Sequence, residues 1–146
     1  QSDGSYKAVA TDTYTAIKNA NAEILAASAK TSGYKWLGTT YSAGKTATGS
    51  VFGGTTSYAG GVLSAVSSDY DAIVGCLKNS DGKNGFMVVN ADDPRLNRAT
   101  SVTLSFGNGY SSVSYYENGV EKTAQLTDGK VTLSVGAGKG LFVIPV

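Results

Sequence analysis

The pattern of hydrophobic positions changes once along the chain, near residue 33. Before that point, one set of residues recurs at steps of three and four, which places its members on one stripe of an α-helix. The stripe contains Val9, Thr13, Tyr14, Ile17, Ala20, Ile24 and Ala27. Asp3 or Ser5 is suited to cap the start of this helix, and Ser32 with Gly33 to end it. We therefore predict an amphipathic helix within residues 1–32, with its stripe packed against the rest of the protein or against a partner.

From residue 70 onward, short apolar or alternating segments are separated by turn residues at regular intervals. They cover 70–78, 85–90, 101–106, 110–117, 120–126, 131–135 and 141–146. Asn118 and Gly119 give the strongest hairpin signal, because a tight two-residue turn needs positive φ at both positions. At least six strands with short antiparallel connections predict a mainly β fold. We expect an antiparallel β-sandwich of two sheets over residues 33–146, preceded by the N-terminal helix and forming one domain with it.

Residues 38–61 carry seven glycines, almost no charge and few apolar side chains. Such a composition is typical of loops and turns. We expect irregular structure here, anchored by Val51 and Phe52. One or two short strands with long loops, or a mobile surface segment, are the alternatives.

Composition and charge remove several classes of function. The chain of 146 residues has no His, which excludes every catalytic triad and metal site that requires an imidazole. Its net charge is +1 without a basic run, so the electrostatic signature of a nucleic-acid-binding protein is missing. No apolar stretch reaches the roughly 20 residues that span a bilayer. We expect neither nucleic acid nor a membrane as a partner.

Cysteine usage and the first residue bear on the compartment. The single Cys76 cannot form an internal disulfide and lies in an apolar run, where we expect it to be a small buried hydrophobic residue. The chain begins at Gln1 and carries no signal peptide, so we expect a processed protein or a piece of a longer one. Abundant Ser, Thr, Gly and Tyr are common in secreted bacterial proteins, which favours an extracellular location, secreted or at the cell surface.

Candidate catalytic residues are scarce. Hydrolysis of a glycosidic bond needs two carboxylates that flank the bond. Glu23 lies on the predicted helix, while Glu117 and Glu121 lie on either side of the predicted hairpin turn. Charges beside a turn are normally solvated, so we predict no catalytic residue and no enzymatic activity for this chain by itself.

Aromatic residues supply the sharpest binding hypothesis, because sugar rings present apolar C–H faces that stack on Tyr and Trp rings. The candidates are Trp36, Tyr34, Tyr41, Tyr58, Tyr115 and Tyr116. Tyr115 and Tyr116 are adjacent in a predicted strand and point to opposite faces, so we expect one of them to be exposed. The competing interpretation is structural, since Tyr and Trp are frequent at the edges of cores. In that interpretation, Trp36 packs between the helix and a sheet.

A second candidate site lies between two predicted strands, where Asn90, Asp92, Asp93 and Asn97 cluster in one loop. Calcium takes its oxygen ligands from loops of this kind. The alternative is an ordinary turn, in which Asp side chains bond to their own backbone. A structural calcium ion is the one cofactor that the sequence offers; otherwise we expect none.

Several segments resemble parts of a known class of enzymes. TYTAIKNANAEILA (13–26) resembles the last helix of the (β/α)-barrel in many bacterial glycoside hydrolases. GFMVVNADDP, VTLSFGNGYSSVSYYENG and VTLSVGAGKGLFVIPV resemble the small β-sandwich that follows such barrels, in which a strand ends in Asn and the final hairpin has a Gly-rich corner. The resemblance covers more than half of the chain and leaves residues 31–68 outside it.

This resemblance implies a non-catalytic accessory domain of a secreted glycoside hydrolase, which stabilises or supports the catalytic barrel of its parent chain. The catalytic carboxylates of these enzymes lie on barrel strands that this chain lacks, so no catalytic residue is carried over. Two alternatives stay open. One is a carbohydrate-binding module that holds polysaccharide on exposed aromatic residues, and the other is a cell-surface module that contacts a protein partner.

Overall fold

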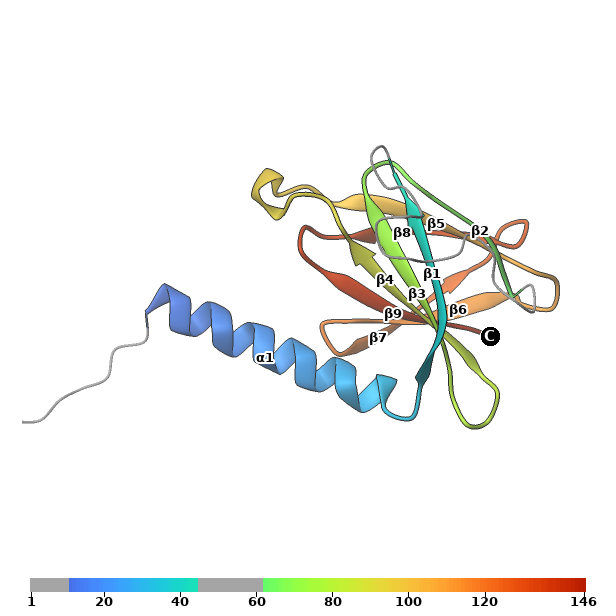
Figure 1. Ribbon diagram of the computed structural model, residues 1–146, viewed down its shortest axis with the longest axis horizontal. Helices are drawn as coiled ribbons and strands as arrows, with labels where there is room; N and C mark the ends of the chain where they lie inside the picture. The colour runs from blue at the N-terminus through green and yellow to red at the C-terminus, as the bar shows by residue number, and fades with distance from the viewer. Residues whose placement is uncertain (1–10, 45–61) are drawn as a thin grey trace, which may run out of the picture.

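The computed structural model describes residues 11–44 and 62–146 of the chain. Within these residues, one α-helix precedes nine strands, which form two antiparallel sheets (Figure 1). The predicted fold class, a helix followed by an antiparallel β-sandwich, is confirmed. In the described part of the chain, no helix has the length and apolar character needed to cross a bilayer.

Helix α1 (Asp12–Thr31) begins where Thr11 caps its first turn, because Thr11 Oγ1 accepts a hydrogen bond from the backbone N–H of Tyr14 (3.2 Å). The cap of this helix is therefore Thr11; the predicted caps Asp3 and Ser5 lie outside the described residues. The predicted end of the helix is confirmed: Ser32 is the C-terminal cap, and Gly33 follows with a φ of 86°.

The larger sheet has six strands and the smaller sheet has three. In spatial order, the larger sheet contains β1 (Lys35–Ala43), β3 (Ala72–Lys78), β4 (Asn84–Asn90), β9 (Gly140–Pro145), β6 (Ser112–Glu117) and β7 (Val120–Gln125). The smaller sheet contains β2 (Leu63–Ser68), β5 (Thr100–Phe106) and β8 (Lys130–Val135). One turn of 3₁₀ helix, η1 (Pro94–Leu96), lies between β4 and β5.

The main core lies between the two sheets. Alternate residues of each strand point inward, as period-two geometry requires. The buried members include Val74, Cys76, Phe86, Val88, Val102, Leu104, Val113, Leu133, Val135, Leu141 and Val143. Phe86 of the larger sheet meets Phe106 of the smaller sheet edge to face, with ring centres 5.6 Å apart. This contact joins the two sheets.

The predicted hairpin at Asn118 and Gly119 is confirmed, with φ values of 51° and 78°. Asp128 and Gly129 make the next turn in the same conformation, with φ values of 51° and 71°. Both central positions of such turns lie in the left-handed region, which Asn, Asp and Gly tolerate best. The two turns fix the register of β6 with β7 and lead from β7 into β8.

Only residues 38–44 of the Gly-rich region are among the described residues, and there the alternative of a short strand holds rather than irregular structure. Residues 38–43 belong to β1, which pairs with β3 from Lys35 to Ala43 with a shift of register between Trp36 and Thr40. β1 is an edge strand, so pairing along one side is enough to hold it. The proposed anchor residues Val51 and Phe52 lie outside the described residues.

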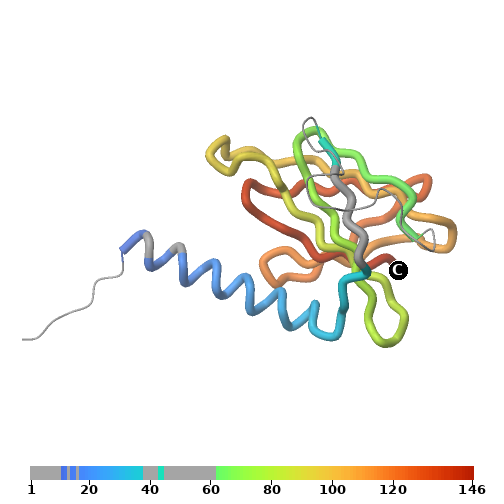
Figure 2. The backbone as a smooth tube through the Cα atoms, viewed as in Figure 1, coloured from blue at the N-terminus to red at the C-terminus, as the bar shows by residue number. Residues whose placement is uncertain are grey.

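Helix α1 does not run along the sandwich but away from it (Figures 1 and 2). Its C-terminal half lies beside the β6–β7 hairpin and β9, and its N-terminal half extends beyond the sheets (Figure 2). Half of the helix is therefore without a covering layer in the described structure.

Candidate docking surface on the larger sheet

The larger sheet carries apolar side chains on both of its faces. Strands β3, β4 and β9 bury alternate residues in the core, and the residues between them point away from the smaller sheet. The pairing of the strands brings the outward side chains together: Ile73 lies opposite Val89, and Met87 lies opposite Phe142. We call this surface the outer apolar face; it consists of Trp36, Ile73, Leu77, Met87, Val89, Tyr116, Phe142 and Ile144.

The smaller sheet has the opposite character. Its outward positions carry hydroxyl groups, and Thr103 Oγ1 lies 2.8 Å from Thr132 Oγ1 of the neighbouring strand. Ser101 lies opposite Ser134 in the same row. An antiparallel sandwich usually exposes a polar outward face of this kind to water. The outer apolar face of the larger sheet therefore calls for a separate explanation.

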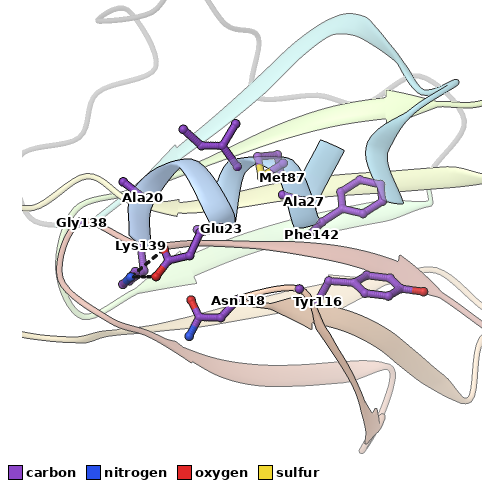
Figure 3. Close-up of a pocket in the computed structure, with 12 residues that line it drawn as sticks. Ala20, Glu23, Ala27, Met87, Tyr116, Asn118, Gly138, Lys139 and Phe142 are labelled. Atoms are coloured by element: carbon purple, nitrogen blue, oxygen red, sulfur yellow. Dashed lines mark hydrogen bonds and ion pairs between the residues drawn. The ribbon is translucent and has the colours of Figure 1, made fainter. Parts of the chain in front are cut away.

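Helix α1 covers one part of the outer apolar face. Ala20, Glu23 and Ala27 of the helix line a groove of about 310 Å³ together with Met87 and Phe142 of the sheet (Figure 3). Ile24 lines the same groove. Helix and sheet are thus joined by a narrow apolar contact.

Three specific contacts fix the helix at this place. Lys139 Nζ donates to both carboxylate oxygens of Glu23, at 2.6 and 2.7 Å. Lys30 Nζ lies 5.1 Å from the centre of the Tyr116 ring, a distance at which a cation is attracted to the ring face. Ala26 packs against the hairpin turn so closely that a β-carbon at Gly119 would collide with it.

Phe142 forms the centre of the covered part and is only 2% exposed. The Tyr34 ring meets it edge to face with centres 5.0 Å apart, and the Tyr116 ring lies over it at 6.4 Å. Gly85 lies beneath, and a β-carbon there would come within 2.6 Å of the Phe142 ring. Burial raises the pKa of both tyrosines, and for Tyr116 a hydrogen bond to Glu121 adds to this effect. This cluster is a second, smaller core outside the sandwich.

Among the described residues, several apolar side chains of the helix are exposed. Tyr14, Ile17 and Ile24 of the helix are 57%, 56% and 64% exposed. These stripe residues are therefore not buried against the sandwich, although Ile24 lines the groove; the alternative, that they pack against a partner, stays a prediction. Tyr14 and Ile17 stay exposed because the N-terminal half of the helix projects past the strands. Val9 lies outside the described residues.

The aromatic candidates that the structure describes have different surroundings. Trp36 is 62% exposed on edge strand β1, so the interpretation that it packs between helix and sheet is wrong. Tyr34 instead contacts Phe142 of the larger sheet. Tyr41 lies in β1 opposite Val74, and Tyr58 lies outside the described residues.

Tyr115 and Tyr116 point to opposite faces, as predicted, but neither is exposed. Tyr115 packs against the main core, and Tyr116 lines the groove beneath helix α1. Both are half-buried because each face of β6 has a covering layer at this point. The expectation of one exposed ring failed because the sequence did not reveal that the helix covers the outward face.

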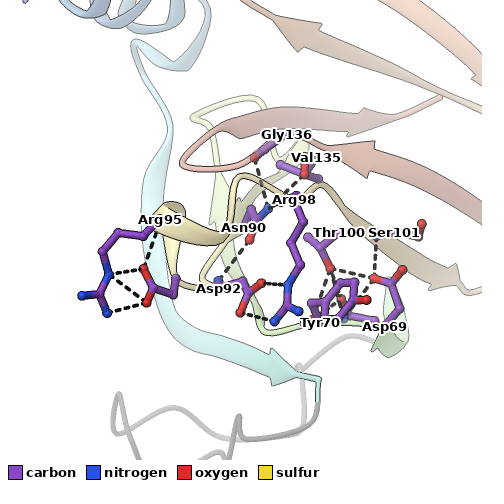
Figure 4. Close-up of polar contacts among 12 residues, drawn as sticks. Asp69, Tyr70, Asn90, Asp92, Arg95, Arg98, Thr100, Ser101, Val135 and Gly136 are labelled. Atoms are coloured by element: carbon purple, nitrogen blue, oxygen red, sulfur yellow. Dashed lines mark hydrogen bonds and ion pairs between the residues drawn. The ribbon is translucent and has the colours of Figure 1, made fainter.

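The loop proposed for calcium is tied together by its own side chains (Figure 4). Asn90 is buried, and its Nδ2 donates to the carbonyl oxygens of Arg98, Val135 and Gly136 at 3.0 to 3.2 Å. Its Oδ1 accepts from the backbone N–H of Asp92 at 3.0 Å. Asn90 therefore connects the end of β4 to the corner after β8.

Both carboxylates of this loop are bound to arginines. Asp92 pairs with Arg98, and Asp93 pairs with Arg95 at 2.6 Å. The guanidinium groups lower the pKa of both aspartates. Asn97 has a φ of 46° and ends the 3₁₀ turn. A calcium ion would have to displace two guanidinium groups, and the described residues contain no group of three or more Cys, Asp or Glu arranged to hold a metal.

A further polar corner, which the sequence did not single out, joins the two sheets. Asp69 Oδ1 accepts from the backbone N–H groups of Ser101 (2.7 Å) and Tyr70 (2.9 Å) and from Thr100 Oγ1 (2.9 Å). The bond from Ser101 is the main cause of the lowered pKa of Asp69. The Tyr70 ring also stacks on the Arg98 guanidinium, with the carbon 3.8 Å from the ring centre. The polar groups of this corner thus bond to one another.

The other candidate catalytic and nucleophilic groups are either in ion pairs or buried. Glu117 forms an ion pair with Lys122 of the neighbouring strand. Cys76 is fully buried, as predicted, and burial raises the pKa of its thiol to about 12. A thiol of this kind is inert at neutral pH.

Sequence reasoning missed Met87, Phe142 and the role of Gly119 in this surface. The signal that could have found them is the unbroken apolar run in residues 86–89 and again in 141–144. A strand whose consecutive residues are all apolar is covered on both faces, whereas a strand with one solvated face alternates.

Comparison with family models, with curated proteins and with solved structures finds no match for this chain.

Proposed function

We propose that this chain is a non-catalytic accessory domain of a secreted glycoside hydrolase, and that it packs on the catalytic barrel and supports it. The observation that carries the proposal is the open apolar surface around helix α1. The sandwich has one ordinary polar face and one outer apolar face, and the helix covers only part of the latter. The domain therefore acts through the molecule that contacts this surface.

Burial of the exposed apolar side chains by a partner would supply free energy for a stable contact. Contiguous apolar surface on a soluble domain marks an interaction site, whereas scattered apolar residues do not. Tyr14, Ile17 and Leu25 lie around one hollow on the helix surface and are each more than half exposed. Full burial of one such side chain contributes about 1.5–3 kcal/mol, so a partner that covers three of them gains several kcal/mol before the entropic cost of association.

The acidic side chains of the described residues favour a supporting role over a catalytic one. Glu23, Glu117, Asp92 and Asp93 each form an ion pair with Lys or Arg. A general acid or a nucleophile for glycoside hydrolysis needs a carboxylate that faces a cleft open to substrate. We expect no turnover of glycosides or esters by the chain alone; activity that disappears in Glu117→Gln or Glu121→Gln would contradict this.

The proposal is tested by joining the chain to the catalytic barrel of its parent protein and measuring thermal unfolding of the barrel. Ile17→Asp combined with Leu25→Asp should lower the unfolding temperature of the barrel, because the charges make the contact unfavourable. Thr132→Asp, on the polar face of the smaller sheet, is the matched control and should have no effect. Equal unfolding temperatures for all three proteins would contradict the proposal.

A second candidate, carbohydrate binding, is favoured by one observation: the Trp36 ring is 62% exposed on an edge strand. One or two stacking rings provide about 4–8 kcal/mol of net binding, which corresponds to micromolar to millimolar affinity. Titration with a panel of oligosaccharides tests this candidate. Trp36→Ala should abolish binding without unfolding the domain, whereas Tyr14→Ala, which removes another exposed ring, should not. Flat titrations of the unchanged protein would eliminate it.

The third alternative, a cell-surface module that contacts another protein, uses the same apolar surface with a different partner. Co-purification distinguishes it from the first. An accessory domain is recovered with glycosidase activity, whereas an adhesion module is recovered with a partner that has none.

A further inference from the structure

The dipeptide Asn-Gly occurs three times in the chain, at residues 84–85, 108–109 and 118–119. The three copies have different surroundings, and only the last lies beneath helix α1. We propose that Asn118 is a site of spontaneous modification, where conversion to aspartate or isoaspartate loosens helix α1 from the larger sheet.

The reaction needs only the chain and water. The backbone nitrogen of Gly119 attacks Cγ of Asn118, and a new C–N bond closes a five-membered succinimide ring. The bond from Cγ to Nδ2 breaks, and Nδ2 leaves as ammonia with the proton of the Gly119 amide. Water then adds to one of the two ring carbonyls and opens the ring, which yields aspartate or isoaspartate. Glycine favours this step because it has no β-carbon to obstruct the approach.

The hairpin turn places Asn118 where this attack is open. Asn118 is exposed, and the β6–β7 ladder closes at the pair of Glu117 and Val120, so the Gly119 amide lies outside the ladder. Asn84 and Gly85 lie inside strand β4 instead, and Gly85 is buried beneath the rings of Phe142 and Tyr34. The backbone there cannot reach the cyclic form without unpairing the strand.

The consequence of the reaction follows from what the turn contacts. Ala26 of helix α1 packs directly on Gly119, so the extra methylene that isoaspartate inserts in the backbone meets the helix. Asn118 also lines the same groove as the ion pair of Glu23 and Lys139 (Figure 3). A carboxylate at Asn118 competes with Glu23 for Lys139 and repels Glu23. Both products weaken the contacts that hold the helix.

The experiment has two parts, and the first measures the reaction. The chain is kept folded at mildly alkaline pH and physiological temperature for several weeks, and its peptides are analysed by mass spectrometry with an assay for isoaspartate. Asn118 should acquire the mass change that replaces NH₂ with OH, in a larger fraction of molecules than Asn84. Conversion at Asn108, an exposed turn away from the helix, shows that the conditions suffice. Conversion at Asn108 with none at Asn118 would overturn the proposal.

The second part measures the effect on the helix through cleavage by trypsin at Lys18 and Lys30, which lie within α1. Asn118→Asp should be cut faster at both lysines than the unchanged chain, because a loosened helix opens more often. Asn108→Asp adds the same charge at the other turn and should be cut at the original rate. Equal rates for the two variants would show that the turn does not hold the helix, and would overturn the proposal.

Discussion

Replacement of Phe142 by Ala tests whether the outer apolar face is a genuine second core. Phe142 is 2% exposed although it points away from the sandwich, and its ring contacts both Tyr34 and Tyr116. Removal of a buried Phe costs about 3–5 kcal/mol, and each aromatic pair accounts for about 0.5–1.5 kcal/mol beyond simple burial. We expect Phe142→Ala to lower the free energy of unfolding by about 3–5 kcal/mol.

Urea denaturation, followed by circular dichroism, measures this free energy, and the slope of the transition shows whether unfolding stays cooperative. Thr132→Ala is the control, because Thr132 points outward from the smaller sheet and is exposed. Its effect should stay within about 1 kcal/mol, because the substitution removes only an exposed cross-strand hydroxyl contact with Thr103. If Phe142→Ala costs less than about 1 kcal/mol, the outer face is an ordinary solvent-facing surface and the reasoning fails.

Three further outcomes follow from individual residues. Ile17→Ala should change the stability of the isolated chain by less than about 1 kcal/mol, since its side chain is 56% exposed; a larger loss in urea denaturation would show that it is packed. Hydrogen bonds from Ser101 and Arg98 hold the pKa of Asp69 and Asp92 below the unfolded value. The contribution of these carboxylates to stability should therefore be complete above the unfolded value of about 3.9, and stability should fall as the pH drops below it through the folded pKa. Asp92→Asn should flatten this decline in the urea midpoint, and an unchanged pH profile would contradict the assignment. Cys76 should not react with a thiol reagent at neutral pH until urea unfolds the chain, because burial raises its pKa to about 12; rapid labelling of the folded protein would refute this.

Much of the β architecture could be predicted from local patterns. The strands after residue 70 have clear alternation or apolar runs bounded by Gly, Asn and Asp, and two of the turns need positive φ at residues that accept it. Strands β1 and β2 were hard to recognise in the sequence because both are edge strands, which need few apolar residues. Only the pairing with β3 and β5 reveals them.

The candidate site was less predictable, because it depends on where the helix lies. The stripe of Tyr14, Ile17 and Ile24 correctly indicates a helix, but periodicity does not tell which face finds a partner within the chain. In the structure, the C-terminal members of the stripe, Ala20, Ile24 and Ala27, line the groove against the sheet, and Ala26 packs on Gly119. Tyr14 and Ile17 are left open.

The central claim is that a catalytic barrel covers the open apolar surface around helix α1. Footprinting with hydroxyl radicals measures it most directly, because the radicals label exposed aromatic and aliphatic side chains one by one. In the chain alone, Tyr14, Ile17, Leu25 and Trp36 should all be labelled strongly, in line with their exposure. When the chain is joined to the barrel of its parent protein, Tyr14, Ile17 and Leu25 should lose most of this labelling. Equal labelling of these three residues in both proteins would contradict it.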